Sequence, residues 1–274
     1  MPRNLLFEYM KNIFVIAFLM SFSLVSVANS DTIDCLLVKK GNKILIEEGK
    51  DCHTLYSPNS SFKIPLAIIG FESDILKGRH SPIWKPQKPV TFLQYYHDGE
   101  QSPSSWMRFS VVWYSQILTQ KLGIKKFQEY VDKLGYGNQD LSGDEGQNNG
   151  LTDSWLTSSL KITPLQQLAF IEKLAKNELP FSKSSQVKAK DLIKLMEESS
   201  RSNWWSMHGK TGSSDFDKSN RKEGYFVGFA EKNGEIISFV LHMSGKDGDK
   251  KSQVGGIYAK KITIERVNKE LITN

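Results

Sequence analysis

The sequence has 274 residues, of which 39% are hydrophobic and 24% are charged, and its formal net charge is +6. These values are typical of a globular protein and exclude a disordered chain. Two cysteines are too few for a disulfide scaffold, and no cysteine or histidine spacing resembles a metal site. The basic residues are scattered, so we expect neither a metal nor a nucleic-acid partner.

Residues 1–30 are typical of a secretory signal peptide. Two basic residues precede the apolar stretch 13–27, which is too short to span a bilayer comfortably. Small residues follow, and they predict cleavage after Ala28 or Ser30. An uncleaved membrane anchor is the alternative. We therefore expect an exported protein of residues 31–274, without stable membrane insertion after cleavage.

Export makes a disulfide between Cys35 and Cys52 chemically possible. Both cysteines could equally stay reduced as small apolar residues. The sequence leaves these two alternatives open.

The exported part is predicted to begin with two strands, 32–38 and 43–47, joined at Gly41 and Asn42. A polar stretch then leads into the apolar run 62–71. The pattern becomes helical over 110–134 and closes at Gly135. Residues 137–153 are rich in Gly and Asn and are predicted to form a loop.

Another helix is predicted to open at Thr163 and Pro164, and a further one to cover 187–198. The chain then changes to strands: a strand over 204–208 runs into Gly209-Lys210-Thr211-Gly212, and a hairpin closes around Asn233 and Gly234. The predicted hairpin strands are 225–231 and 235–242, and the last helix is predicted over about 253–271.

Strands therefore lie at both ends of the chain, with helices between them. This order predicts an α+β fold, in which a central antiparallel sheet is built from both chain ends and flanked by helices. We expect one catalytic unit, with a sheet subdomain from 31–57 plus about 200–274. The inserted, mostly helical subdomain covers about 58–199.

The first candidate for chemistry is a Ser-x-x-Lys pair. The sequence contains four: Ser60–Lys63, Ser158–Lys161, Ser185–Lys188 and Ser219–Lys222. Only the first pair opens an apolar run, and there a helix would put both side chains on one face. Ser60 would lie at the positive end of that helix, and apolar neighbours would favour the neutral amine of Lys63. The other three pairs are expected to be solvated surface.

Two further segments could join this pair. Lys210-Thr211-Gly212 occurs once, at the end of a strand pattern, and Ser110-Val111-Val112 lies between the other two motifs. Each motif alone is only a weak indication of function. In chain order, Ser-x-x-Lys, a central serine motif and Lys-Thr-Gly form the signature of β-lactamases and penicillin-binding proteins.

On these residues the sequence resembles the class D serine β-lactamases, the oxacillinases. The resemblance spans nearly the whole exported chain, in order. It is carried by residues 58–64, 106–113, 136–138, 149–156 and 224–229.

The resemblance implies that Ser60 is the nucleophile and that Lys63 is N-carboxylated by carbon dioxide, so that its carbamate serves as general base. Trp155 would donate its indole N–H to this carbamate, while Val112 and Leu156 would keep the pocket dry. No other cofactor is implied. Only a neutral amine reacts with carbon dioxide, so an apolar pocket is required.

The resemblance also implies the handling of the substrate. Ser110 would pass a proton to the lactam nitrogen, Lys210 would keep the site electropositive, and the backbone N–H groups of Ser60 and Ser213 would form the oxyanion hole. The implied substrate-binding residues are Thr211, Gly212, Trp106 and Tyr136.

The implied activity is hydrolysis of the β-lactam amide of penicillins and some cephalosporins, which confers β-lactam resistance. A monomer in the bacterial periplasm is expected. Two departures from the family bear on this: Asn59 precedes the nucleophile where many relatives have a small residue, and residues 255–261 lack the arginine that many relatives use for the substrate carboxylate. The alternatives are a penicillin-binding β-lactam sensor domain and a cell-wall D,D-peptidase.

Overall fold

The structure, a computed structural model, describes residues 32–87, 98–196, 205–214, 222–245 and 253–273. The predicted signal peptide lies outside these ranges, so its prediction stays untested. None of the helices within them is both long and apolar enough to cross a membrane.

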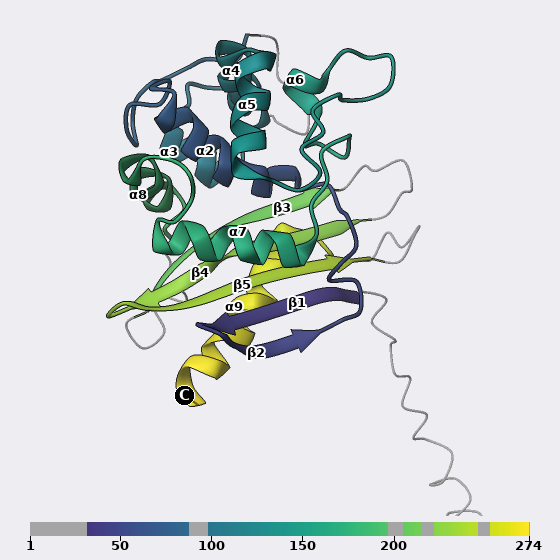
Figure 1. The fold of residues 1–274 in the computed structure, drawn as a ribbon, viewed down its shortest axis with the longest axis vertical. Helices are drawn as coiled ribbons and strands as arrows, with labels where there is room; N and C mark the ends of the chain where they lie inside the picture. Colours follow the sequence, from purple (N-terminus) through teal and green to yellow (C-terminus); the bar gives the residue numbers. More distant parts are fainter. Residues whose placement is uncertain (1–31, 88–97, 197–204, 215–221, 246–252, 274) are drawn as a thin grey trace, which may run out of the picture. The chain divides into compact units, whose positions relative to one another are not determined.

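Five strands form one antiparallel sheet in the order β2-β1-β5-β4-β3 (Figure 1). Their bounds are β1 Thr32–Lys40, β2 Lys43–Glu48, β3 Ser206–Ser214, β4 Glu223–Lys232 and β5 Glu235–Ser244. The first strand of the chain pairs with the last one, so that Leu37 lies opposite Val240. The sheet is therefore built from both chain ends, and the predicted α+β fold is confirmed.

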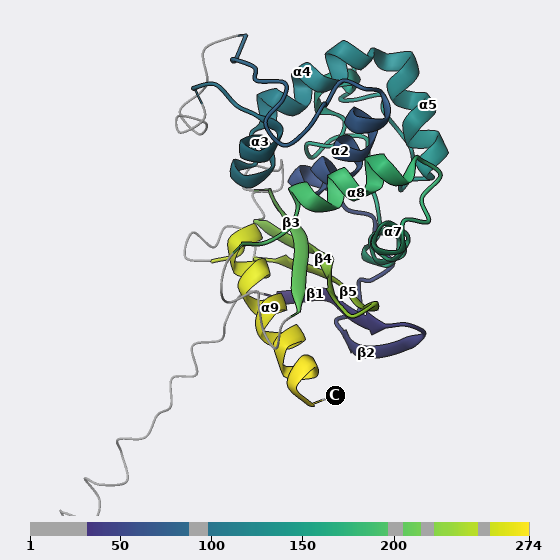
Figure 2. The same ribbon diagram turned by 90° about the vertical axis from the view of Figure 1, so that its left-hand side faces the viewer.

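Alternation along the strands gives the sheet two apolar faces. On β1, Leu37 faces the helical layer, whereas Leu36 and Val38 belong to the core that contains α9 (Gly256–Thr273). Figure 2 shows α9 along one face of the sheet and the other helices on the opposite side. Both faces are thus excluded from water, which explains why β4 and β5 are buried over most of their length.

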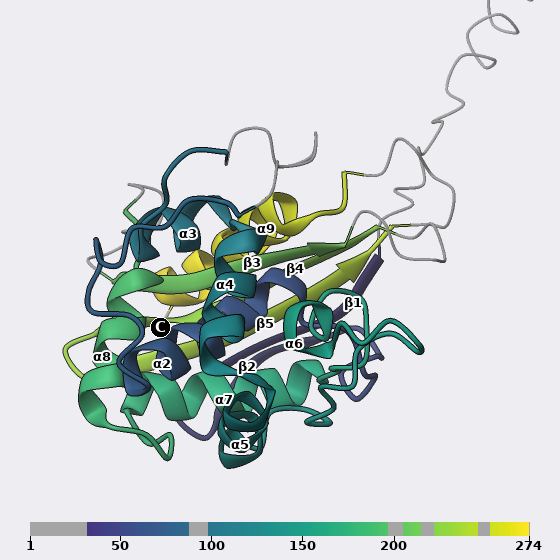
Figure 3. The same ribbon diagram turned by 90° about the horizontal axis from the view of Figure 1, so that it is seen from above.

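The second layer is made of helices from the middle of the chain. Its members are η1 Asn59–Phe62, α2 Lys63–Glu72, α3 Pro103–Phe109, α4 Val112–Leu122, α5 Ile124–Leu134, α6 Gly150–Asp153, α7 Pro164–Lys176 and α8 Lys183–Leu192. The helix α7 packs on β5 and β4, and α2 packs on α8 (Figures 1 and 3). Nine of the ten residues of α2 are buried, which explains its uninterrupted apolar sequence.

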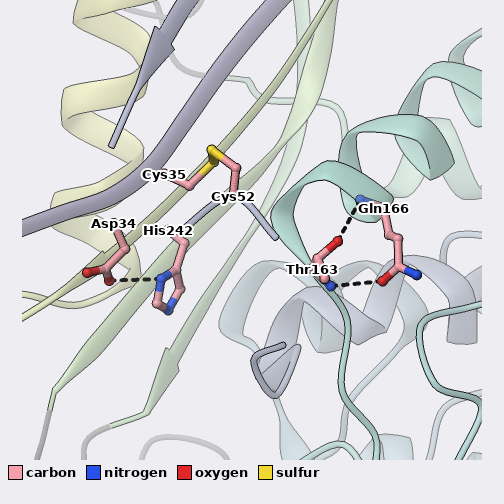
Figure 4. The surroundings of a disulfide bond; sticks show 6 residues. All are labelled: Asp34, Cys35, Cys52, Thr163, Gln166 and His242. Atoms are coloured by element: carbon pink, nitrogen blue, oxygen red, sulfur yellow. Dashed lines mark hydrogen bonds and ion pairs between the residues drawn. A yellow bond between two sulfur atoms is a disulfide. The ribbon is translucent and has the colours of Figure 1, made fainter. Parts of the chain in front are cut away.

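The start of α7 is where the sequence predicts it. Thr163 Oγ1 accepts a hydrogen bond from the backbone N–H of Gln166 at 3.1 Å, and Gln166 Oε1 accepts one from the N–H of Thr163 at 3.0 Å (Figure 4). Pro164 follows as the first helical residue. This reciprocal capping box satisfies two backbone donors that a helix start leaves free.

The structure differs from the predicted elements at four points. The segment 110–134 is two helices, because Gly123 adopts φ +77° between α4 and α5. The helix α3 was not predicted, and Ser110 ends it in a left-handed conformation. The helix α8 begins at Lys183, four residues before the predicted start, and β3 continues beyond the Lys-Thr-Gly motif to Ser214.

Cys35 and Cys52 form a disulfide with a Cα–Cα distance of 5.0 Å (Figure 4). Cys35 is on β1, and Cys52 is in the segment that leads to Ser60. Beside the bridge, the carboxylate of Asp34 lies 2.9 Å from Nδ1 of His242 on β5. The disulfide therefore ties the segment before the nucleophile to β1, and the Asp34–His242 contact joins β1 to β5.

Candidate active site

The turn that carries Ser60 is fixed by backbone bonds. The N–H of Asn59 donates to the carbonyl of Trp155 at 3.0 Å, and Ser61 Oγ donates to the carbonyl of Pro58 at 2.6 Å. Asn59 has φ +47°, a left-handed conformation that asparagine tolerates better than most residues. Ser60 follows in η1 and is partly exposed, so its hydroxyl is accessible.

Lys63 is the first residue of α2, and its side chain is completely buried. Its Nζ donates to Ser60 Oγ at 3.2 Å, as the spacing of three residues in a helix predicts. Burial, and then the charge of Lys210, hold the pKa of Lys63 well below its usual value. Both causes favour the neutral form of the amine beside the hydroxyl. Pro65 in the first turn costs no helical hydrogen bond.

Aromatic rings pack around Phe62, the residue before Lys63. Trp155 is fully buried, stacks on Phe62 at 5.6 Å between ring centroids, and meets the edge of Phe127 at 6.2 Å. Its indole Nε1 is buried without a hydrogen-bond partner in the described structure. A buried N–H without an acceptor costs folding free energy, so this donor would be stabilised by an acceptor placed beside it. Val112 and Leu156 are half-buried.

A second serine–lysine pair comes from β3 and the end of α3. Lys210 Nζ donates to Ser110 Oγ at 3.0 Å, to the carbonyl of Thr211 at 2.9 Å and to Thr211 Oγ1 at 3.1 Å. Burial and the nearby charge of Lys260 lower the pKa of Lys210 to about 7. Near neutral pH this amine is thus poised between its charged and neutral forms.

Gly212 brings β3 against the nucleophile turn. A Cβ atom at this position would lie 3.1 Å from the carbonyl oxygen of Pro58 and 3.3 Å from the N of Ser61. A larger residue would push the strand away, so glycine allows the close approach. Ser213 follows and is exposed, while its Oγ accepts a hydrogen bond from the N–H of Gly256 at 2.7 Å.

Trp106 and Tyr136 do not lie where the resemblance implies. Both are buried, with 0% and 3% exposure, so neither is open to a substrate. The indole N–H of Trp106 donates to Ser115 Oγ at 2.9 Å, and the ring of Tyr136 packs on Phe62 at 5.2 Å. The expectation that these two residues contact the substrate is therefore wrong. Both belong to the buried core that supports the site.

The other Ser-x-x-Lys pairs also differ from expectation. Ser158 and Ser185 are buried rather than solvated. Ser185 lies in the first turn of α8, where its backbone N–H donates to Oγ of Ser182, the N-cap. Lys161 Nζ donates to Ser57 Oγ at 2.7 Å. Ser219 lies outside the described residues.

Sequence reasoning missed a cleft of about 330 Å³ next to Lys210. Arg108 from α3, Lys194 after α8 and Lys260 from α9 line it. These three residues are far apart in the sequence, and no local pattern connects them. Within the described chain, no cluster of three or more His, Cys, Asp or Glu side chains could hold a metal.

The site contains two serine–lysine pairs, one of them with a fully buried amine, and a strand edge that approaches the nucleophile turn. These features define a serine-dependent acyl-transfer site. In this arrangement a serine hydroxyl is activated by a neighbouring base and attacks a carbonyl.

Comparisons with known proteins show which family of serine acyl-transfer proteins this chain resembles. The family model of the penicillin-binding protein transpeptidase domain matches residues 36–264. The chain is 40% identical to β-lactamase OXA-9 of Klebsiella pneumoniae over 241 residues, which cover 82% of this chain and 83% of the relative. It is 36% identical to β-lactamase OXA-1 of Escherichia coli over 218 residues, which cover 79% and 76%.

Among solved structures, the class D β-lactamase OXA-427 superimposes with a TM-score of 0.77 and 34% identity. The match covers 87% of this chain and 98% of that one. The chain belongs to the class D serine β-lactamases.

Proposed function

We propose that this protein opens the β-lactam ring of penicillins and some cephalosporins through an acyl-enzyme on Ser60, and so confers resistance to them. One observation carries the proposal: a fully buried lysine, Lys63, donates from its Nζ to Ser60 Oγ at 3.2 Å. The named β-lactamases among its relatives support the substrate class.

In the acylation step, Ser60 Oγ attacks the lactam carbonyl and the carbon–nitrogen bond of the ring breaks. The backbone N–H groups of Ser60 and Ser213 would hold the developing oxyanion, which the approach of Gly212 to the nucleophile turn supports. The leaving nitrogen takes its proton from Ser110, whose hydroxyl accepts a hydrogen bond from Lys210. Lys210 and Thr211 would hold the carboxylate of the ring.

The fit of a carbamate on Lys63 is supported by two features. The lowered pKa of Lys63 favours the neutral amine that reaction with carbon dioxide requires, and Trp155 Nε1 is a buried donor without a partner in the described structure. Val112 and Leu156 would limit entry of bulk water. A carbamate here would supply the base for the proton of Ser60 and, in the second step, for that of the water that releases the product.

Export to the periplasm is part of the proposal. The signal-like sequence of residues 1–30 and the Cys35–Cys52 disulfide support it, because disulfides persist in oxidising compartments. A monomer remains our prediction.

The test follows hydrolysis of a chromogenic cephalosporin by the purified protein, with and without added bicarbonate. We expect sustained turnover that rises with bicarbonate. A single stoichiometric burst that bicarbonate does not extend would instead indicate a sensor or a peptidase-like acyl acceptor. The absence of any reaction would contradict the assignment of Ser60.

A further inference from the structure

The cleft beside Lys210 is strongly cationic. Five of the residues that line it are basic: Arg79, Arg108, Lys194, Lys210 and Lys260. None of the lining residues that the structure describes is acidic. Arg79 is balanced by Asp191, whose carboxylate lies 2.9 Å away. Arg108 and Lys194 face the cleft with no carboxylate in its described lining, so the cleft attracts anions.

The cleft extends from the catalytic residues in one direction along β3. It is lined by Lys210 and Thr211 but not by Ser60 or Ser213. The segment after α8 pairs with the first half of β3, because Gly209 N–H donates to Ile193 O at 2.9 Å and Leu195 N–H donates to Met207 O at 2.8 Å. The cleft therefore runs from Lys210 toward the beginning of β3, away from Ser213.

Because the cleft runs from Lys210 toward the beginning of β3, its position shows which part of a bound substrate would enter it. In the proposed reaction the scissile carbonyl lies between the N–H groups of Ser60 and Ser213, and the ring nitrogen lies at Ser110 and Lys210. The fused ring and its carboxylate are attached to that nitrogen, so they point along the cleft. The acyl side chain is attached on the other side of the carbonyl and points toward the end of β3.

We propose that this cleft is a subsite for a second anionic group on the ring side of the substrate, as found on the C3 substituent of some cephalosporins. The inference rests on the proposed function. Lys210, Thr211 and Lys260 attract the ring carboxylate, and Arg108 and Lys194, both exposed at the cleft, attract the group beyond it. Cationic C3 substituents are disfavoured by the same charges.

The probes are cefamandole and cefonicid, which share one acyl side chain and differ only in a methyl or a sulfomethyl group on the C3 tetrazole. The measurement is the ratio of kcat/KM for the sulfonate to that for the methyl compound. We expect a ratio of about five, since two exposed ion pairs each contribute a few-fold. The ratio should fall toward one as salt is raised.

The variants are Arg108→Gln, Lys194→Gln and the double substitution. Each single substitution is expected to lower the ratio about twofold, and the double variant to bring it close to one. Lys125→Gln is the matched control, because Lys125 is an exposed lysine on α5 outside the cleft. It should leave the ratio unchanged.

A second pair tests the opposite charge. Cefalotin and cefaloridine share the thienylacetyl side chain, and the C3 substituent is neutral in the first and a cationic pyridinium in the second. We expect the protein to favour the neutral compound, and the double variant to reduce that preference.

A ratio of one or less in the unaltered protein, or a preference that the double variant retains, would overturn the subsite while leaving the hydrolase intact. Failure to hydrolyse any of the four compounds would overturn the subsite. Failure to hydrolyse benzylpenicillin as well would overturn the proposed function itself.

Discussion

The two sides of the active site each bury one lysine, and the two lysines differ in what surrounds them. On the helical side, Lys63 lies among apolar side chains and donates to Ser60 Oγ. On the sheet side, Lys210 donates to three oxygens, from Ser110 and Thr211. Burial lowers both pKa values, that of Lys63 well below its usual value and that of Lys210 to about 7.

The difference shows how one residue type serves two purposes. An amine with few polar neighbours loses its charge, so it is available as a nucleophile toward carbon dioxide. An amine with several oxygen acceptors keeps enough of its charge near neutral pH to attract a carboxylate. Burial is the first cause of both shifts, and in each case the charge of a second lysine adds to it: Lys210 for Lys63, and Lys260 for Lys210.

The largest expected effect comes from removing the helical-side lysine. Lys63→Ala should lower steady-state turnover by about a thousandfold or more, because the general base is lost. Mass spectrometry should then detect a persistent acyl adduct on Ser60. Lys188→Ala is the matched control, since Lys188 belongs to another Ser-x-x-Lys pair but is exposed on α8. Full turnover in Lys63→Ala would show that the two lysines do not have separate roles.

A smaller effect is expected from the wall of the helical-side pocket. Trp155→Phe keeps an aromatic ring against Phe62 but removes the indole N–H. The bicarbonate concentration for half-maximal turnover should rise about ten- to hundredfold, the range for loss of a hydrogen bond to a charged group. Trp113→Phe, at a buried tryptophan on α4, is the control. An unchanged bicarbonate requirement would mean that Trp155 serves packing alone.

The smallest effect concerns pH and the sheet-side lysine. Lys210 is charged below a pKa of about 7 and neutral above it, so substrate attraction weakens as the pH rises through this value. With saturating bicarbonate, kcat/KM should therefore fall several-fold above about pH 7.

The neighbouring cation Lys260 provides the check. Its charge lowers the pKa of Lys210, so Lys260→Gln should raise that pKa and shift the falling limb of the profile to higher pH. The measured quantity is the pH at which kcat/KM falls to half of its maximum, not the overall rate. A limb that stays in place or moves to lower pH would refute the coupling.

The sequence predicted the parts of the site that depend on local spacing. Ser60 and Lys63 meet because helical geometry puts residues three apart on one face. The apolar run around Lys63 also indicated its burial, and the start of α7 at Thr163 followed from capping chemistry. That both chain ends contribute to one sheet was predictable, because strand patterns occur at both ends.

The parts that depend on distant contacts were not predictable. Trp106 is removed from the substrate by packing and by a hydrogen bond to Ser115, which no spacing rule indicates. The strand β3 extends beyond Lys210 because β4 pairs with it along its full length. The cationic cleft combines residues from α3, from the end of α8 and from α9, so it exists only in the folded chain.

The most direct test of the central claim is carbon-13 NMR of the protein equilibrated with ¹³C-labelled bicarbonate. If Lys63 is the neutral amine of the pair, a carbamate resonance should appear, disappear in Lys63→Ala, and persist in Lys210→Ala. A spectrum without a carbamate resonance, or one in which the resonance depends on Lys210 instead, would contradict the account.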